Sequence, residues 1–244
     1  MPTQIPKHCV IGAIVSREDP RDALVMRAGL PYCSLSELPP GSVVGTSSIR
    51  RMAHIRRLYP HLTLTDARGN VPRRLQKLDD HENFGYDALI LAAAGLIRLN
   101  LQNRITMYLT APEALHAVGQ GAIAIELREG DTHTQNMLDG INHEPTAKAC
   151  LAERALMRRL EGGCSVPIGV ASSWGDDAKT LTLMASVSSP DGEKFVEVEM
   201  HEEVTDIKTA EAFGVKAAER LIELGCQPIL DAIENNRRNT VKKN

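Results

Sequence analysis

The chain has 244 residues, of which 43% are hydrophobic and 24% are charged, as in ordinary globular proteins. Its formal net charge of −3 excludes a protein whose overall electrostatic field attracts nucleic acid. Only 3% of the residues are aromatic, which is too few for the stacking platforms that bind single-stranded nucleic acid.

The first predicted element is a strand over residues 9–15, followed by a charged turn over residues 17–22. Few other elements are predicted in the first forty residues. Together with a second predicted strand at 123–127, the first strand makes at most a two-stranded sheet, which is marginal on its own. We therefore assign residues 1–40 and 117–135 to an incomplete remnant of a first domain.

Three strand–helix units follow between residues 42 and 115, with strands predicted at 42–45, 62–65 and 88–92. Regular alternation of strands and helices predicts a parallel sheet covered by helices. We assign residues 41–116 to a second domain of the α/β class.

Arginine stands at or just past the end of each of these three strands. The carboxyl ends of parallel strands meet at one edge of a sheet, where α/β proteins bind ligands and helix N-termini point N–H groups at anions. A single arginine at such a place is usually solvated surface, but three consecutive units favour a site. Because the guanidinium fork pairs with carboxylates and phosphates, we predict a ligand that carries several of these groups.

The segment Gly119-Gln120-Gly121 formally matches the beginning of a dinucleotide-binding motif. It precedes a predicted strand instead of opening a helix, so the structural context of that motif is missing. We interpret it as a tight crossing between domains.

The last third of the chain has a different pattern. A helix is predicted over 145–160, a hairpin over 181–199 with its turn at 189–192, and a second helix over 209–224. The polar and basic tail at 235–244 is predicted to be disordered. Residues 145–244 therefore form a third domain, a small α+β unit with an antiparallel sheet.

The chain has no run of about eighteen apolar residues and no signal peptide at its first residues. Its five cysteines are scattered and form no Cys-x-x-Cys pair, which fits a reducing compartment. We expect a cytoplasmic protein with no nucleic-acid or membrane partner. No spacing typical of a metal site is present.

Cys164 lies on a loop with two preceding glycines and Pro167 close behind. A free cysteine is by default buried and unreactive. A thiol on a glycine-flanked loop is also placed to act as a nucleophile or as an attachment point. The spacing alone leaves both interpretations open.

Several segments together resemble the hydroxymethylbilane synthase family, also called porphobilinogen deaminases. The resemblance covers nearly the whole chain. The segments that carry it are Val44-Gly45-Thr46-Ser47-Ser48-Ile49-Arg50-Arg51, Arg68-Gly69-Asn70-Val71, Leu91-Ala92-Ala93-Ala94-Gly95-Leu96, Ala117-Val118-Gly119-Gln120-Gly121-Ala122, Glu153-Arg154-Ala155 and Leu160-Glu161-Gly162-Gly163-Cys164-Ser165-Val166-Pro167.

This resemblance implies a transferase that joins porphobilinogen units into the linear tetrapyrrole hydroxymethylbilane, with release of ammonia, in haem biosynthesis. It implies three domains, the first two of the periplasmic-binding-protein type, and a monomer. It also implies a dipyrromethane cofactor held covalently by Cys164. The residues implied to bind the cofactor and substrate are Thr46, Ser48, Arg50, Arg51, Arg68, Asn70, Arg74, Arg98 and Gln120.

The chain departs from the family pattern at its beginning. By the resemblance, the catalytic aspartate would be the residue just before Met1, so no catalytic residue is identified here. From this we expect an N-terminally truncated and impaired enzyme. A non-catalytic module that binds polycarboxylates is the alternative, and an unrelated enzyme with a cysteine nucleophile is a second one.

Overall fold

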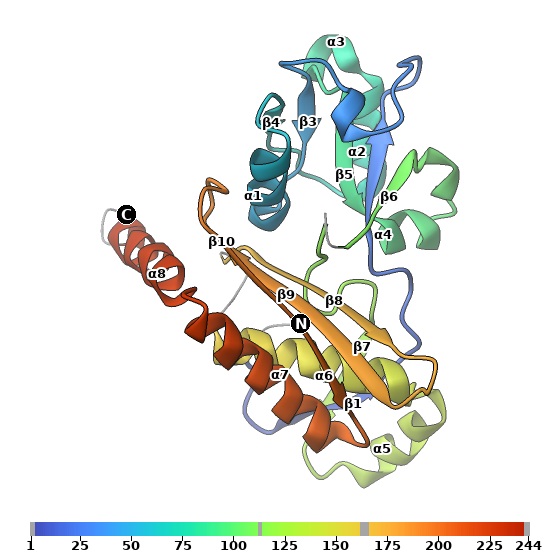
Figure 1. The fold of residues 1–244 in the computed structure, drawn as a ribbon. Helices are drawn as coiled ribbons and strands as arrows, with labels where there is room; N and C mark the ends of the chain where they lie inside the picture. Colours follow the sequence, from blue (N-terminus) through green and yellow to red (C-terminus); the bar gives the residue numbers. More distant parts are fainter. Residues whose placement is uncertain (1–2, 112–113, 162–165, 242–244) are drawn as a thin grey trace.

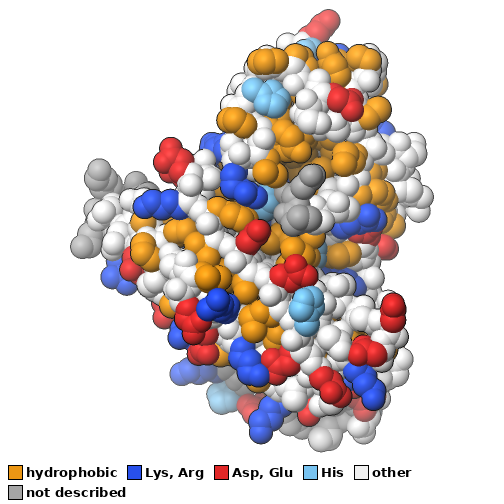
Figure 2. Space-filling model, viewed as in Figure 1, with side chains coloured by type: hydrophobic (Ala, Val, Ile, Leu, Met, Phe, Trp, Pro, Cys, Tyr) orange, Lys and Arg blue, Asp and Glu red, His pale blue; other side chains and the backbone are white. Residues whose placement is uncertain are grey.

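The computed structural model describes residues 3–111, 114–161 and 166–241. They form an upper and a lower unit, and the chain passes from one to the other along two neighbouring segments (Figure 1). On the face drawn in Figure 2, hydrophobic side chains gather over the upper unit, whereas charged side chains of both signs are interspersed over the lower one. Within the described ranges, no helix is both long and apolar enough to cross a membrane.

The upper unit is built on a five-stranded sheet with the strand order β4-β3-β5-β2-β6. β3 (Val43–Gly45) is parallel to β4 (Thr63–Thr65) and to β5 (Ala88–Ala92), which confirms the three predicted strands. β2 (Asp22–Met26) lies between β5 and β6 (Met107–Leu109) and is antiparallel to both. The predicted parallel strands are therefore present, but the sheet is mixed because β2 and β6 add antiparallel pairs that the sequence did not predict.

Helices cover both faces of this sheet. α1 (Ile49–Leu58) and the short helix η1 (Leu35–Glu37) pack on one face, where Ile55 and Leu35 contact the core. α2 (Val71–Asp79) and α4 (Ala93–Arg98) pack on the other face through Leu75, Leu78 and Leu96. α3 (His81–Phe84) and η2 (Gln102–Arg104) complete the unit.

The assignment of residues 1–40 to a separate first domain is wrong for β2. β1 (Cys9–Ile14) pairs antiparallel with β7 (Ala124–Arg128) in a two-stranded sheet of the lower unit. β2 instead is buried along its whole length inside the upper sheet. The chain changes units at residues 15–21, because the apolar run that follows Asp22 is a central strand and not part of a remnant.

The lower unit also contains the predicted α+β elements. β8 (Ile168–Trp174), β9 (Thr180–Ser188) and β10 (Phe195–Glu203) form an antiparallel sheet, which confirms the hairpin. α6 (Glu144–Arg159) and α7 (Ile207–Glu223) confirm the two predicted helices. α5 (Thr132–Leu138) and η3 (Asp139–Ile141) follow β7.

The prediction of a disordered tail is wrong for most of its length, because α8 extends over Gln227–Val241. Ile229, Leu230 and Ile233 are buried against the core formed by α6, α7 and the antiparallel sheet. These contacts hold the first half of the helix, and the polar residues that dominate its second half continue it beyond the core.

The two crossing segments, residues 15–21 and 114–123, are joined by backbone hydrogen bonds. The amide of Glu18 donates to the carbonyl of Gly121, and the amide of Val15 donates to the carbonyl of Ile123, both at 3.1 Å. Gly121 has a φ of +81°, and a Cβ there would strike the carbonyl oxygen of Glu18. The prediction of a tight crossing at Gly119-Gln120-Gly121 is therefore confirmed.

A second contact joins the units where the β9–β10 turn meets α1. Arg56 donates to the carbonyl of Pro190 at 2.8 Å, and the guanidinium of Arg57 lies 3.8 Å from the centroid of the Phe195 ring. Gly192 approaches α1 so closely that a Cβ would lie 2.5 Å from the carbonyl oxygen of Ala53. The turn thus holds α1 from the side of the lower unit.

The substitution Gly192→Ala is expected to lower the free energy of unfolding by about 2 kcal/mol, because it adds a collision with α1 to the strain of a left-handed backbone. Gly130→Ala is the matched control: Gly130 has the same φ of +83°, but no atom lies within 4 Å of its Cβ position. The control is expected to lose only about 1 kcal/mol. Equal losses in urea unfolding would contradict a role for the turn in holding α1.

Candidate functional site

Three helices begin at one edge of the upper sheet, as the sequence predicts. β3, β4 and β5 run in the same direction, so α1, α2 and α4 start where these strands end. Ser48 caps α1 by accepting from the amide of Arg51 at 3.4 Å, and Asn70 caps α2 by accepting from the amide of Arg73 at 3.0 Å. These polar caps let α1 and α2 begin, whereas α4 follows Ala92 without a side-chain cap.

The first turns of α1 and α2 contain no acidic residue. Both carry a pair of arginines instead, Arg50 and Arg51 in α1 and Arg73 and Arg74 in α2. A helix N-terminus carries a partial positive charge that favours anions, so basic residues there are unfavourable unless an anion is nearby. This edge of the sheet is therefore suited to a negatively charged ligand.

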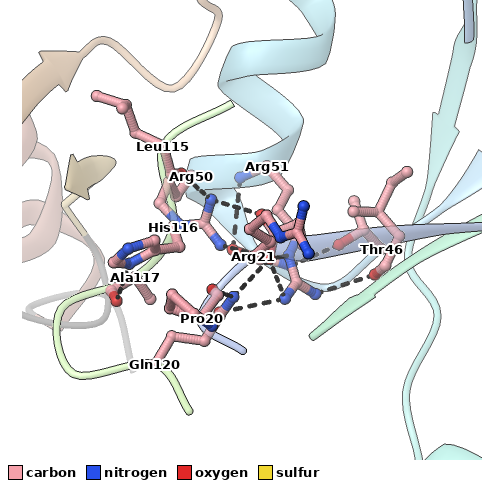
Figure 3. Close-up of polar contacts among 12 residues, drawn as sticks. Pro20, Arg21, Thr46, Arg50, Arg51, Leu115, His116, Ala117 and Gln120 are labelled. Atoms are coloured by element: carbon pink, nitrogen blue, oxygen red, sulfur yellow. Dashed lines mark hydrogen bonds and ion pairs between the residues drawn. The ribbon is translucent and has the colours of Figure 1, made fainter. Parts of the chain in front are cut away.

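Figure 3 shows the guanidinium groups of Arg50 and Arg51 close to Gln120. Both arginines pair with one buried carboxylate, that of Asp22 at the start of β2. Arg50 Nη1 lies 2.8 Å from Asp22 Oδ2, and Arg51 Nη2 lies 2.8 Å from Asp22 Oδ1. Burial alone would raise the pKa of Asp22, but the charges of the two guanidinium groups outweigh it and hold the pKa well below its ordinary value. Asp22 is therefore ionised and fixes both arginines.

The crossing segment adds Gln120 to this cluster. Its Nε2 donates to Asp22 Oδ1 at 2.8 Å and to the carbonyl of Pro20 at 2.6 Å, and its Oε1 accepts from Arg51 at 3.4 Å. Arg98, at the end of α4, donates to the carbonyl of the next residue, Gly121, at 2.7 Å. The structure thus brings Arg50, Arg51 and Gln120 together and places Arg98 beside them.

Arg68 and Arg74 lie toward solvent at the beginning of α2. The side chain of Arg68 is 83% exposed and pairs with Asp66 at 2.7 Å. Arg74 donates from Nε to the carbonyl of Gly69 at 2.6 Å. Burial is the main cause that lowers the pKa of Arg51, and the nearby charges of Arg50 and Arg74 lower it further. Thr46 is buried behind them, and its hydroxyl accepts from the amide of Ser48 at 3.3 Å. Arg68, Arg74 and the exposed Arg98 are the arginines of the set with accessible guanidinium donors left for a ligand.

A second buried carboxylate lies on the other side of the crossing. Glu153 of α6 pairs with Arg17 at 2.7 Å and accepts from the Ser172 hydroxyl at 2.6 Å and from the amide of Gly119 at 2.7 Å. Burial raises the pKa of Glu153, but Arg17 and His116 outweigh it, and the net pKa is lowered. Sequence reasoning did not identify Asp22, Arg17 and Glu153 as partners. The available signals were the charged turn that contains Arg17 and Asp22 and the segment with Glu153 that carries part of the resemblance.

Cys164, the predicted attachment point, lies outside the described residues. Among the described cysteines, Cys150 is buried, and burial raises the pKa of its thiol to about 12, so it is no nucleophile near neutral pH. Cys33 is exposed on the surface of the upper unit. Within the described part of the chain, no three His, Cys, Asp or Glu side chains are grouped to hold a metal ion.

Two family models match the chain. The first, porphobilinogen deaminase, dipyromethane cofactor binding domain, matches residues 1–136. The second, porphobilinogen deaminase, C-terminal domain, matches residues 147–223.

The chain is also similar to proteins named porphobilinogen deaminase from fungi and a cyanobacterium. It is 54% identical over 233 residues to the protein from Yarrowia lipolytica, which covers 96% of this chain and 68% of that protein. It is 48% identical over 239 residues to the protein from Debaryomyces hansenii, an alignment that covers 98% of this chain and 66% of that protein. It is 47% identical over 233 residues to the protein from Synechococcus elongatus, which corresponds to 96% of this chain and 70% of that protein. The chain therefore spans about two thirds of the length of these relatives.

Proposed function

The chain belongs to the porphobilinogen deaminase family, and from this premise we propose that it is a hydroxymethylbilane synthase that works with a dipyrromethane cofactor. The enzyme is a transferase that joins porphobilinogen units head to tail into hydroxymethylbilane and releases ammonia. The observation that carries the proposal is the edge of the upper sheet, where the first turns of two helices hold four arginines and no acid. Each pyrrole ring of porphobilinogen and its oligomers carries an acetate and a propionate side chain, so these molecules match this edge in charge.

The same edge fits the cofactor. A dipyrromethane carries four carboxylates, and the arginine-bearing helix N-termini and exposed donors of Arg68 and Arg74 supply the opposite charge. The proposed ligands of cofactor and substrate are those that the sequence indicated: Thr46, Ser48, Arg50, Arg51, Arg68, Asn70, Arg74, Arg98 and Gln120, with Cys164 as the point of covalent attachment.

The arginines of this site have two roles: some bind carboxylates that enter from solvent, and others act from a fixed position. Arg68 and Arg74 bind carboxylates that enter from solvent, because part of each guanidinium is free of protein acceptors. Arg50 and Arg51 act from a fixed position, since Asp22 and Gln120 hold them. When bound, the cofactor supplies the pyrrole carbon to which the first substrate unit is added. The protein's arginines neutralise the accumulating carboxylates and keep the growing chain at this edge.

The finer features of the fold and the setting are part of the proposal. The upper sheet, with helices on both faces and a double chain crossing, supports a periplasmic-binding-protein-like architecture. The scattered cysteines support a cytoplasmic location, and a monomer is proposed because the site is assembled from one chain.

The purified chain is expected to carry one covalent dipyrromethane on Cys164 after incubation with porphobilinogen. Intact-protein mass spectrometry measures the added mass, and peptide mapping locates it. Cys164→Ser is expected to lose the adduct completely, whereas Cys33→Ser, which removes an exposed thiol, keeps it.

Other outcomes of this experiment distinguish the alternatives. Reversible binding of porphobilinogen without added mass would contradict the synthase and favour a module that only binds polycarboxylates. An adduct on a cysteine other than Cys164 would contradict the proposed attachment point. Conversion of added porphobilinogen to hydroxymethylbilane, followed by its absorbance after oxidation, tests the reaction itself.

A further inference from the structure

Arg17 lies on the crossing segment 15–21, and its guanidinium joins this segment to both α6 and the second crossing segment. Its Nη1 and Nη2 bind the carboxylate of Glu153 in α6 at 2.7 and 3.1 Å, and its Nε donates to the carbonyl of Gln120 at 2.8 Å. The side chain of Arg17 is 11% exposed, and that of Glu153 is fully buried. One planar group thus fixes three segments of the chain relative to one another.

The ion pair of Arg17 and Glu153 also holds the backbone around Gln120 from two sides. Glu153 Oε2 accepts from the amide of Gly119 at 2.7 Å, while Arg17 donates to the carbonyl of the next residue, Gln120. Gln120 lies between Gly119 and Gly121, whose φ angles are +67° and +81°. Because glycine has the widest choice of backbone conformations, contacts from outside the segment are needed to fix Gln120.

The side chain of Gln120 extends from this fixed backbone toward Arg51 at the start of α1 (Figure 3). Its Nε2 donates to Asp22 Oδ1 at 2.8 Å, and its Oε1 accepts from Arg51 Nη2 at 3.4 Å. Within the described ranges, no hydrogen bond or ion pair joins Arg17 directly to Asp22 or Arg51. The contacts of Arg17 therefore reach Arg51 by way of Gln120.

We propose that Arg17, held by Glu153, is a positioning residue that orients Gln120 and, through it, the guanidinium of Arg51. The lower unit thereby sets the direction of a binding group in the upper unit. The consequence for ligand binding rests on the proposed function, in which Gln120 and Arg51 are ligands of the cofactor and substrate. If the ion pair only stabilised the fold, the Gln120 side chain would be held equally well in folded molecules that lack it.

The test replaces Arg17 by lysine in the full chain without added ligand. Lysine keeps a positive charge opposite Glu153 but lacks the Nε that donates to Gln120. NMR of the isotope-labelled protein follows hydrogen exchange at the side-chain amide of Gln120, whose signal is identified by its absence in Gln120→Ala. Exchange is expected to be about ten-fold faster in Arg17→Lys, which corresponds to the loss of one hydrogen bond.

Two controls separate this effect from a general loosening of the chain. The side-chain amide of Gln135, which donates to a backbone carbonyl within the lower unit, is expected to exchange at an unchanged rate in Arg17→Lys. Arg104→Lys alters an arginine–carboxylate pair outside the crossing segments, and it is expected to leave exchange at Gln120 unchanged.

Ser172→Ala provides a milder variant should Arg17→Lys fail to fold, as judged by circular dichroism. It removes the hydroxyl that donates to Glu153 at 2.6 Å and leaves both partners of the ion pair in place. Exchange at Gln120 is expected to be about three-fold faster, because Glu153 loses one of the contacts that fix its orientation.

Binding of porphobilinogen, measured by calorimetry, tests the consequence of this positioning. The Cys164→Ser protein is used, so that no covalent bond forms at that residue. Arg17→Lys is expected to raise the dissociation constant about five-fold when Gln120 is present, but less than about two-fold when Gln120→Ala is also present. Equal rises with and without Gln120 would overturn the proposed route.

Two results with the ligand-free chain would also overturn the proposal. One is unchanged exchange at Gln120 in a folded Arg17→Lys or Ser172→Ala protein, and the other is an equal acceleration at Gln135 or in Arg104→Lys. Absence of porphobilinogen binding to the chain with Arg17 intact would instead contradict the proposed function. The exchange rates would still decide whether Arg17 positions Gln120.

Discussion

Replacing Asp22 by asparagine is expected to lower the free energy of unfolding by about 3–5 kcal/mol. The change keeps the size of the side chain but removes its charge. It leaves the guanidinium groups of Arg50 and Arg51 buried side by side without a counterion. Denaturation in urea, followed by circular dichroism, measures the loss.

Asp79→Asn is the matched control for this prediction. Asp79 also accepts two hydrogen bonds from an arginine, Arg104, but its side chain is 48% exposed. Exposed ion pairs contribute about 1 kcal/mol or less, so the control is expected to lose little. A similar loss of unfolding free energy in both variants would contradict the prediction that the buried Asp22 cluster contributes more to stability than an exposed ion pair.

The pH dependence of the difference between the unaltered chain and Asp22→Asn provides a second readout. Because the pKa of Asp22 is lower in the folded state, its charge stabilises the fold fully above the ordinary aspartate pKa of about 3.9. The contribution declines as the pH falls below that value toward the depressed pKa of the folded state. We therefore expect a constant difference between pH 8 and pH 5 and a smaller one below about pH 4. A decline between pH 8 and pH 5 would contradict the depressed pKa.

The substitution Gly214→Ala is expected to lower the free energy of unfolding by about 2–3 kcal/mol. Gly214 lies in the middle of α7, where a Cβ would collide with the carbonyl oxygen of Ala152 in α6. Alanine favours a helix over glycine by about 1 kcal/mol, which acts in the opposite direction. Overpacking against a backbone atom is the larger effect, because the carbonyl has no free rotation by which to move aside.

Gly140→Ala tests whether the loss comes from the contact between the helices. Gly140 lies in the short helix η3, and no atom lies within 4 Å of its Cβ position. Its replacement is expected to change the stability by about 0.5 kcal/mol or less. Urea unfolding measures both variants. A higher free energy of unfolding for Gly214→Ala would contradict the prediction, because α6 and α7 would then move apart without loss of stability.

Elements that depend on neighbouring residues could be predicted from the sequence. β3 and β5 are short apolar runs, and β4 is the alternating run Thr63-Leu64-Thr65. The β9–β10 turn contains Ser189-Pro190-Asp191-Gly192, a local hairpin signal. The arginines at the edge of the upper sheet could be located for the same reason. Each of these arginines follows its strand closely in the sequence, so its position at the strand end can be predicted from neighbouring residues alone.

Features that depend on distant residues could not be predicted. β2 is a strand because Leu24 pairs with Ile90 on one side and with Met107 on the other, and the charged run before it obscured its beginning. The role of Asp22 depends on Arg50, 28 residues away, and on Gln120, 98 residues away. A sequence pattern indicates that arginines are near a strand end, but it does not show which acid already holds them.

Asp22, the first residue of β2, pairs directly with Leu109, the last residue of β6. The first and the last strand of the upper unit therefore meet at the side where the chain crosses to the lower unit. During synthesis on the ribosome, this unit has all five of its strands once Leu109 has emerged. β1 is synthesised earlier but cannot pair until β7 has been made, and the antiparallel sheet of the lower unit cannot be completed until β10 has been made. The middle of the chain can therefore fold first, while the edges of β1 stay open to pairing with other nascent chains until its own partner arrives.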